Sequence, residues 1–227
     1  MRIRELFVEA EGEGNKVSTT SWATDLFAPT PEPEPEAGAP DAEPSTADAD
    51  AELGTPAADS DSATKRVLDF IASKESGGDY NKRNGGSRAN LTRMSIAQVL
   101  ESQRRFRTWP SATSSAVGRY QYIRSTLSEM VRVMNLDINT TLFDAATQDA
   151  IAVKDMQRRC KLNEWLAGDI TDAQFMNLLS RVWAAIPNSS TGQSTYQGVG
   201  NNTAGMTAQS GLQQLAAIRT GTGTATA

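Results

Sequence analysis

The sequence predicts a mainly helical fold with one small β element, and three observations lead to this prediction. Apolar residues recur at helical spacing in several segments of residues 64–200. Three of these segments follow a pair of residues that matches the capping box, a signature of a helix start. One short stretch, residues 117–123, alternates instead between side-chain types, as a short strand or hairpin does. The predicted domain therefore comprises residues 64–200, which is long enough to bury a core.

The helical elements are predicted from start and stop signals in chain order. The first helix begins at Ser62 or Thr64 and stops at Gly77-Gly78, and a long helix capped by Asp144 runs to about Cys160. The remaining helices follow the three capping-box pairs, and Pro187 follows the last of them. These pairs are Ser95 with Gln98, Thr126 with Glu129, and Thr171 with Gln174.

Two segments precede this domain and one follows it. Residues 1–27 form a short leader with few apolar groups, which is either a disordered start or a docking peptide for a larger assembly. Residues 28–63 form an acidic linker rich in Pro and Ala, whose apolar content is too low to offset the entropy of ordering, so we expect a disordered arm. Residues 201–227 form a tail rich in Gly, Thr and Ala, with one weak helix around Leu215.

Composition excludes several classes of chemistry. The 227 residues contain no His and one Cys, so a Ser-His-Asp triad, a Cys-His dyad and a histidine zinc site are impossible. The sequence has no glycine-rich phosphate-binding motif, and we expect no nucleotide, no metal and no other cofactor. Catalysis would have to come from carboxylates, lysines, hydroxyls or the backbone.

The charge is distributed unevenly along the chain. Residues 1–64 hold 15 acidic and 3 basic side chains, a net charge of −12, whereas residues 65–227 hold 12 acidic and 19 basic ones, a net charge of +7. A positive domain behind a negative arm indicates an anionic partner, for which bacterial cell wall, a membrane surface and nucleic acid all qualify. Nucleic acid has the least support, because no binding motif accompanies the charge. We expect no integral membrane segment and no secretory signal, so the protein is expected to be made in a host cytoplasm.

Glu75 is the candidate catalytic residue. It stands at the C-terminal end of the first predicted helix, where the helix dipole disfavours a negative charge and should raise the pKa of the carboxyl group. A glutamate with a raised pKa suits a general acid at neutral pH. The position taken alone favours an ordinary exposed glutamate at a helix end over a catalytic one.

Four blocks in order strengthen the catalytic interpretation. They are Glu75-Ser76-Gly77-Gly78-Asp79-Tyr80-Asn81, Ser115-Ala116-Val117-Gly118-Arg119-Tyr120-Gln121, residues 143–152, and Trp183-Ala184-Ala185-Ile186-Pro187 followed by Gly192-Gln193. Together they resemble the bacteriophage lambda lysozyme family of lytic transglycosylases, over roughly residues 65–200. The resemblance implies a lysozyme-like fold. It also implies cleavage of the β-1,4 bond between N-acetylmuramic acid and N-acetylglucosamine in peptidoglycan, with a 1,6-anhydro product.

The resemblance also implies roles for individual residues. Glu75 matches the single catalytic acid of the family, and Tyr120 and Gln121 match a hairpin that lines its sugar groove. Packing is the alternative role for each tyrosine, and contact with a helix C-terminus is the alternative for Arg119. The candidate substrate-binding residues are Ser76, Gly118, Arg119, Tyr120, Gln121 and Tyr196.

A transglycosylase needs one carboxylate, because the 6-hydroxyl of the muramoyl residue is the nucleophile. A hydrolase needs a second carboxylate, for which Asp79 is the nearest candidate, although its place after Gly-Gly also suits a turn. The chain is thus interpreted as a phage lytic transglycosylase that the leader tethers to virion proteins, so that it acts on glycan strands in the bacterial periplasm or cell wall during genome entry. The alternatives are a hydrolytic muramidase acting as an endolysin in host lysis, and a non-catalytic virion structural protein that keeps the lysozyme fold.

Overall fold

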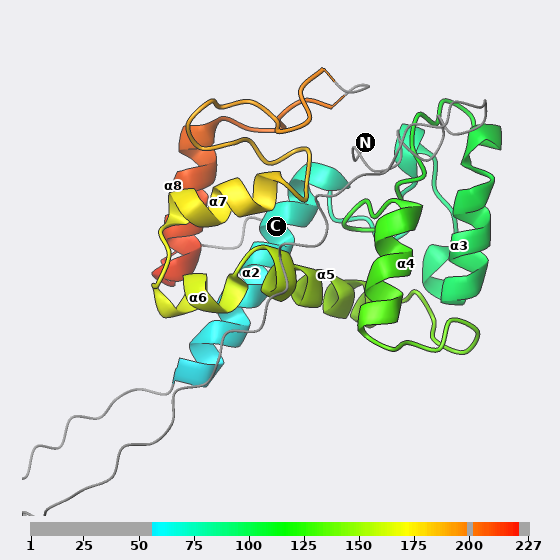
Figure 1. Cartoon of the computed structure of the whole chain (residues 1–227), viewed down its shortest axis with the longest axis horizontal. Coiled ribbons are helices and arrows are strands. Elements are labelled where there is room, and N and C mark those ends of the chain that lie inside the picture. The colour runs from blue at the N-terminus through cyan, green and yellow to red at the C-terminus, as the bar shows by residue number, and fades with distance from the viewer. Residues whose placement is uncertain (1–55, 199–201, 223–227) are drawn as a thin grey trace, which may run out of the picture. The chain divides into compact units, whose positions relative to one another are not determined.

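Helices dominate the computed structural model, which describes residues 56–198 and 202–222 (Figure 1). The prediction of a mainly helical fold is confirmed. The predicted leader, residues 1–27, and the linker as far as residue 55 lie outside the described residues. The α-helices in the described part of the chain are α2 Pro56–Glu75, α3 Ile96–Arg104, α4 Arg124–Val133, α5 Ala145–Arg159, α6 Leu162–Ala167, α7 Asp172–Ser180 and α8 Ala208–Arg219; short 3-10 helices span Asn84–Gly86, Leu91–Arg93 and Phe106–Thr108.

Helix α2 begins earlier than the sequence pattern predicts. It starts at Pro56, so the predicted start at Ser62 or Thr64 is wrong, and residues 56–63 of the predicted linker are helical. Proline is well suited to the first turn of a helix, where its missing N–H costs no hydrogen bond, and Ala57 and Ala58 behind it are strong helix formers. The apolar pattern becomes visible only after these residues, which is why it predicts a later start.

The second half of α2 is buried and ends at Glu75. Val67 and Ile71 are completely buried on the face that meets the core. Gly77 follows with φ +70°, in the left-handed region that ends a helix and that favours glycine. The stop predicted at Gly77-Gly78 is confirmed, and it places Glu75 on the last turn of the helix.

Local capping explains the starts of three further helices. In α3, the Ser95 side chain accepts the N–H of Gln98 while the Gln98 side chain accepts the N–H of Ser95, and the same reciprocal pair joins Thr171 and Gln174 in α7. Asp144 caps α5 by accepting the N–H of Thr147 at 2.8 Å. These three predicted helix starts are confirmed.

The remaining predicted capping box, Thr126 with Glu129, is wrong. Helix α4 begins at Arg124, with Ile123 as its N-cap and no side-chain cap bond, so Thr126 lies inside the first turn. Thr126 is also buried, so its side chain packs within the protein and does not cap the helix.

The predicted β element is small. Val117 and Tyr122 form an isolated antiparallel bridge through reciprocal backbone hydrogen bonds of 3.1 and 3.0 Å. The turn between them is tight, with φ values of +76° at Gly118 and +48° at Gln121. In the described residues the β structure consists of isolated bridges only, and this hairpin is one of them.

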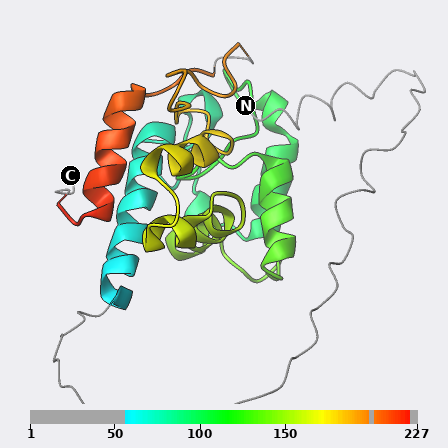
Figure 2. The same cartoon turned by 60° about the vertical axis from the view of Figure 1, so that its left-hand side comes forward.

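Helix α8 forms part of the core, although its sequence predicts only a weak helix in a tail. It packs against α2 and α7, and Leu215 and Ile218 are buried there (Figure 2). The guanidinium of Arg66 in α2 donates to the carbonyl oxygen of Ile218 at 3.0 Å. Near the other end, Gly205, just before α8, lies beside Lys74 of α2, so the two helices run antiparallel.

Aromatic side chains fill the centre of the fold. Trp165 is completely buried and stacks on Phe175 with ring centroids 4.4 Å apart. Trp109 is buried and lies under the guanidinium of Arg83 at 4.5 Å. Trp183 follows the end of α7 and is also buried.

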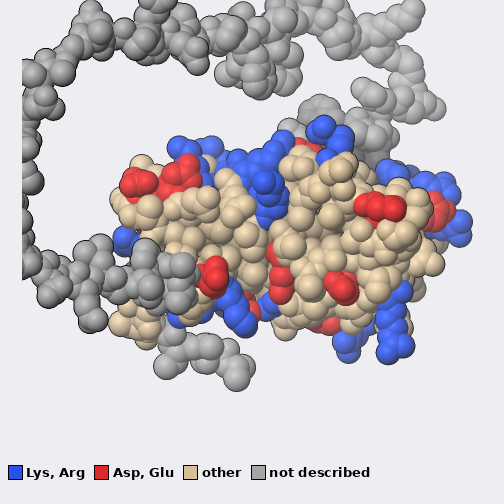
Figure 3. Space-filling view, turned by 90° about the horizontal axis from the view of Figure 1, so that it is seen from below, with Lys and Arg blue, Asp and Glu red and all other residues tan. Residues whose placement is uncertain are grey.

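The surface shown in Figure 3 carries Lys and Arg side chains in several separate groups, with Asp and Glu side chains between them. A single continuous basic stripe, as expected for tracking a nucleic-acid backbone, is not visible on this face. Of the helices described, none combines the length and the apolar character needed to cross a membrane.

Candidate active site

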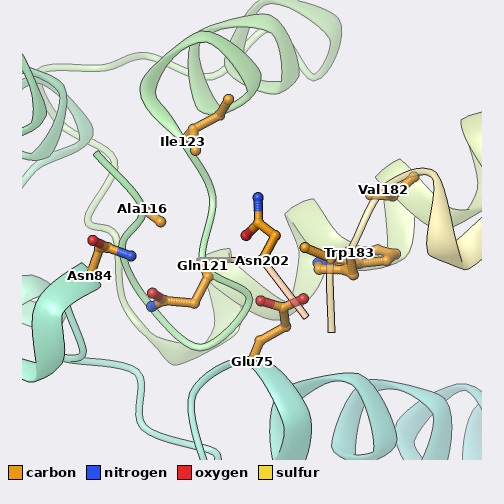
Figure 4. A pocket seen from close by; sticks show the side chains of 9 residues that line it. Glu75, Asn84, Ala116, Gln121, Ile123, Val182, Trp183 and Asn202 are labelled. Atoms are coloured by element: carbon orange, nitrogen blue, oxygen red, sulfur yellow. The ribbon is translucent and has the colours of Figure 1, made fainter. Parts of the chain in front are cut away.

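Glu75 lines a pocket of about 150 Å³ at the end of α2 (Figure 4). The walls come from the end of α2, the 3-10 helix at Asn84, the hairpin and the residues after α7, so segments far apart in sequence meet here. The lining residues are Glu75, Asn84, Ala116, Gln121, Ile123, Val182, Trp183, Ala184 and Asn202.

The Glu75 carboxylate is held by the segment that follows α7. The backbone N–H of Ala185 donates to Glu75 Oε1 at 3.2 Å. Glu75 is partly buried, and Figure 4 shows its carboxylate pointing into the pocket. A backbone donor on one oxygen fixes the orientation of the group, which is a requirement for proton transfer to a bound substrate.

Three carboxamide side chains surround the same pocket, from Asn84, Gln121 and Asn202. The oxygen of Asn84 accepts the backbone N–H groups of Thr113 and Ser114 at 2.9 and 3.1 Å, which leaves the amide nitrogen as the group it offers to a ligand. Gln121 is oriented in the opposite sense, because its nitrogen donates to the carbonyl of Gly118 at 2.8 Å and its oxygen remains as an acceptor. The pocket therefore presents both a donor and an acceptor, the pair that an acetamido group requires.

The rest of the pocket wall is apolar. Ala116, Ile123, Val182 and Trp183 contribute to it, and all four are buried residues of the core. The Trp183 indole N–H donates to the carbonyl oxygen of Tyr120 at 3.2 Å, which ties this wall to the hairpin. The polar groups of the pocket thus stand on a wall fixed by core packing.

Among the predicted substrate-binding residues, Gln121 lines the pocket and the others do not. Tyr120 is 1% exposed and Tyr196 is 8% exposed, so neither ring has a face free to stack on a sugar. The Tyr196 hydroxyl donates to the carbonyl oxygen of Arg181, and the Tyr120 hydroxyl to Asp149. Both tyrosines have the packing role that the sequence left open as the alternative.

Ser76 and Gly118 also contact other groups of the protein. The Ser76 hydroxyl is buried and donates to the carbonyl of Arg119 at 2.7 Å. A Cβ atom at Gly118 would lie 2.4 Å from Oε1 of Gln148, so the close neighbour of this glycine is a protein side chain. The prediction that its backbone approaches a sugar chain is not supported by this arrangement.

Arg119 belongs to the turn of the hairpin, has a side chain that is 13% exposed, and is not among the residues that line the pocket. It forms ion pairs with Asp69 and Asp149. Burial, followed by the hydrogen bond to the Asp149 carboxylate, raises the pKa values of Tyr80 and Tyr120 above the ordinary value of 10.0. Neutral phenols therefore act as donors to Asp149.

The other carboxylates considered from the sequence are engaged elsewhere. Asp79 pairs with Arg88 at 2.8 Å and accepts the backbone N–H of Asn81 at 2.9 Å, as expected of a turn residue. Asp144 is a helix cap, and Asp149 belongs to the contacts of Arg119. Glu75 is the one carboxylate among the residues that line the pocket. The described residues contain no cluster of three or more acidic or Cys side chains able to hold a metal ion.

Sequence reasoning missed Asn84, Asn202 and the Ala185 N–H. Asn84 precedes Gly85-Gly86, a turn signal that indicates a loop but not a pocket. Asn202 approaches Glu75 only through the folded path of the chain after α7, and no local pattern signals this contact. A backbone donor such as Ala185 carries no side-chain signature at all.

Comparison with known proteins gives one family and two similar structures. A family model described as Endolysin matches residues 65–202. Bacteriophage lambda lysozyme complexed with a chitohexasaccharide is 19% identical with a TM-score of 0.43, over 70% of this chain and 94% of that chain. A second structure of lysozyme from bacteriophage lambda is 20% identical with a TM-score of 0.45, over 69% of this chain and 94% of that chain. No curated protein matches the chain.

Proposed function

Since the chain belongs to the Endolysin family, a group of lysozyme-like, peptidoglycan-degrading phage proteins, we propose that it is a lytic transglycosylase with Glu75 as its catalytic acid. The substrate is the glycan strand of peptidoglycan, cut at the β-1,4 bond between N-acetylmuramic acid and N-acetylglucosamine. The observation that carries the proposal is the presence of one carboxylate, Glu75, among the pocket-lining residues.

The proposed reaction needs only this one carboxylate. Protonated Glu75 donates its proton to the glycosidic oxygen as the bond to the anomeric carbon breaks. The 6-hydroxyl of the same muramoyl residue attacks the anomeric carbon and forms the 1,6-anhydro bond. The Glu75 carboxylate then accepts the proton of that hydroxyl, which restores the acid for the next cycle. No water is consumed, and no second carboxylate is required.

The amide groups of the pocket support an N-acetylated substrate. Asn84 offers a donor and Gln121 an acceptor on the wall near Glu75. The carbonyl of an acetamido group can accept from the first, and its N–H can donate to the second. The binding role proposed for the pocket therefore rests on these residues, with Gln121 retained from the sequence prediction.

The experiment is a product analysis of purified peptidoglycan by mass spectrometry. We compare the wild type with Glu75→Gln and with Asp79→Asn, a matched control that removes the neighbouring carboxylate. Loss of a general acid lowers the rate by about 10²–10⁴-fold. We expect fragments lighter by the mass of one water than hydrolysis products, from the wild type and Asp79→Asn but not from Glu75→Gln.

The other outcomes select the alternative functions. Fragments with ordinary reducing ends would mean a hydrolytic muramidase and would contradict the transglycosylase. Loss of activity in Asp79→Asn would make Asp79 a second catalytic carboxylate. No fragments from the wild type would favour a non-catalytic structural role.

The proposal includes association with a virion through residues 1–27, with the part of the predicted arm before Pro56, residues 28–55, letting the domain reach the wall. The support is the acidic, Pro-rich composition of that arm, which a freely diffusing lytic enzyme does not require. Detection of the protein in purified phage particles is the expected result. Its presence only in late-infection lysate would favour a free endolysin.

A further inference from the structure

A group of charged and phenolic side chains joins the hairpin to α2 and α5, and the proposed reaction does not use it. We call it the Arg119 cluster, and it consists of Arg119, Asp69, Asp149, Tyr80 and Tyr120. Arg119 Nη1 donates to the Tyr80 hydroxyl at 2.7 Å and lies 3.4 Å from Asp149 Oδ1, while Nη2 donates to Asp69. The two tyrosine hydroxyls donate to Asp149, from Tyr80 at 2.9 and 3.0 Å and from Tyr120 at 2.7 Å.

The guanidinium of Arg119 also lies over aromatic rings. Its Cζ atom is 4.9 Å from the ring centroid of Tyr80 and 5.6 Å from that of Tyr120. Cation–π contacts add to the hydrogen bonds, and a planar guanidinium makes several contacts at once where a lysine ammonium makes fewer. The cluster thus joins α2, the loop after α2, the hairpin and α5 through one side chain.

Arg119 reaches the chain on both sides of Glu75. Asp69 precedes Glu75 on α2, and the Arg119 side chain binds it. Ser76 directly follows Glu75, and its hydroxyl donates to the Arg119 backbone carbonyl at 2.7 Å. The segment from Asp69 to Ser76, which contains Glu75, is therefore bonded to Arg119 at both ends.

Arg119 and its neighbour Tyr120 are also connected to the opposite wall of the pocket. Gln121, which lines the pocket, is two residues beyond Arg119 in the hairpin. The carbonyl oxygen of Tyr120 accepts the indole N–H of Trp183 at 3.2 Å, and Trp183 also lines the pocket. A shift of Arg119 would consequently change the position of Glu75 relative to Gln121 and Trp183.

We propose that Arg119 is a positioning residue, which sets the distance between the Glu75 carboxylate and the substrate-contacting wall without touching substrate. This role rests on the proposed function, because it is a role in that reaction. Misplacing a reacting group by about 1 Å costs on the order of 10²-fold in rate. Arg119→Met should therefore lower kcat by about 10–100-fold and leave KM nearly unchanged.

The experiment measures kcat and KM on solubilised glycan strands for Arg119→Met and Arg119→Lys, using the full chain. The control is Arg159→Met, because Arg159 is another partly buried arginine that pairs with an aspartate, Asp155, and neither residue of that pair lines the pocket. All variants are assayed at a temperature at which circular dichroism shows them folded. We expect Arg159→Met to lose stability but to keep kcat, and Arg119→Lys to retain more of kcat than Arg119→Met.

Ser76→Ala gives a second and milder test. It removes one hydroxyl and with it the bond to the Arg119 carbonyl, and we expect kcat to fall by about tenfold or less. If Ser76 and Arg119 act through the same link, their effects on kcat are not independent. The fall in kcat of the double variant Ser76→Ala/Arg119→Lys is then smaller than the product of the two single falls. If Arg119→Met does not fold, these two substitutions decide the question by the same criteria.

The outcomes separate the positioning role from the proposed function. A loss in Arg119→Met no larger than in Arg159→Met would overturn the positioning role, and so would a rise in KM at unchanged kcat, which would indicate substrate binding. A wild type that releases no fragments refutes the proposed function itself, and the positioning role falls with it.

Discussion

Gly118→Ala should destabilise the protein far more than a substitution at a glycine of similar backbone geometry. A Cβ atom at residue 118 would lie 2.4 Å from Gln148 Oε1 and 3.0 Å from a ring carbon of Phe143. Gln148 is 1% exposed, so its side chain has no solvent to move into. The backbone at Gly118 also has φ +76°, which an alanine adopts only at a cost.

The magnitude follows from these two effects. The left-handed backbone costs about 1–2 kcal/mol for a residue with a Cβ atom. Gln148 accepts the N–H of Arg119 at 2.9 Å and donates to the carbonyls of Phe143 and Tyr80 at 2.9 and 3.2 Å. Displacing it far enough to break one of these bonds leaves a buried group unpaired, at about 1–3 kcal/mol. We expect a total loss of about 2–5 kcal/mol, which is a decrease in Tm of about 4–20 °C for a domain of this size.

The assay is equilibrium unfolding in urea, followed by tryptophan fluorescence, with Gly168→Ala as the control. Gly168 has φ +85°, but no atom lies within 4 Å of its added Cβ, so this variant should lose only about 1–2 kcal/mol. In a Gln148→Ala background the extra cost of Gly118→Ala should disappear. If the two glycine variants differ by less than about 1 kcal/mol, the displacement of Gln148 is not the cause of the loss.

Two further predictions concern α8 and the phenols. Leu215→Ala removes a fully buried side chain and should cost about 2–5 kcal/mol in urea unfolding, more than Leu212→Ala on the partly exposed side of α8; equal losses would mean that α8 does not contribute to the core. The pKa values of Tyr80 and Tyr120 are raised above the ordinary value of 10.0, so their contribution to stability is present below pH 10 and is lost as the pH rises above it. Phenolate absorbance should show both tyrosines ionising at a higher pH than a free tyrosine, and their titration near pH 10 in the folded protein would contradict this.

The helix ends that depend on neighbouring residues could be predicted from the sequence. Ser95 with Gln98 satisfies the N-terminal N–H groups of α3 through side chains three residues apart, so the signal and the structure lie in the same short segment. The stop at Gly77 is equally local. These two kinds of signal were enough to place Glu75 on the last turn of a helix.

The hairpin shows the limit of a strand pattern at a turn. Residues between the bridged Val117 and Tyr122 form the turn, and Gln121 has φ +48° there. Side chains in such a turn do not alternate as they do in an extended strand. The pattern of residues 117–123 therefore predicts the hairpin, but it does not predict that Tyr120 is buried while Gln121 lines the pocket.

Contacts between segments that lie far apart in the chain could not be predicted from the sequence. Asn202 meets Glu75 only because the chain returns to the end of α2 after α7, and α8 is stable because α2 and α7 cover it. Tertiary burial stabilises such a helix where intrinsic propensity does not, so its sequence looks weak in isolation. The role of Glu75 in catalysis and the predicted domain boundary at residue 200 stay predictions.

The antiparallel pairing of α2 and α8 determines how the domain can be attached to anything else. The described chain enters at Pro56 and places Glu75 at the opposite end of a helix of 20 residues, about 30 Å away. The C-terminal end of α8 returns along α2 to Arg66, away from the pocket. A fusion partner or a surface linker joined before Pro56 or after Thr222 is therefore attached away from the end of α2 that carries Glu75. Immobilisation through either end is accordingly compatible with access by a large, insoluble polymer.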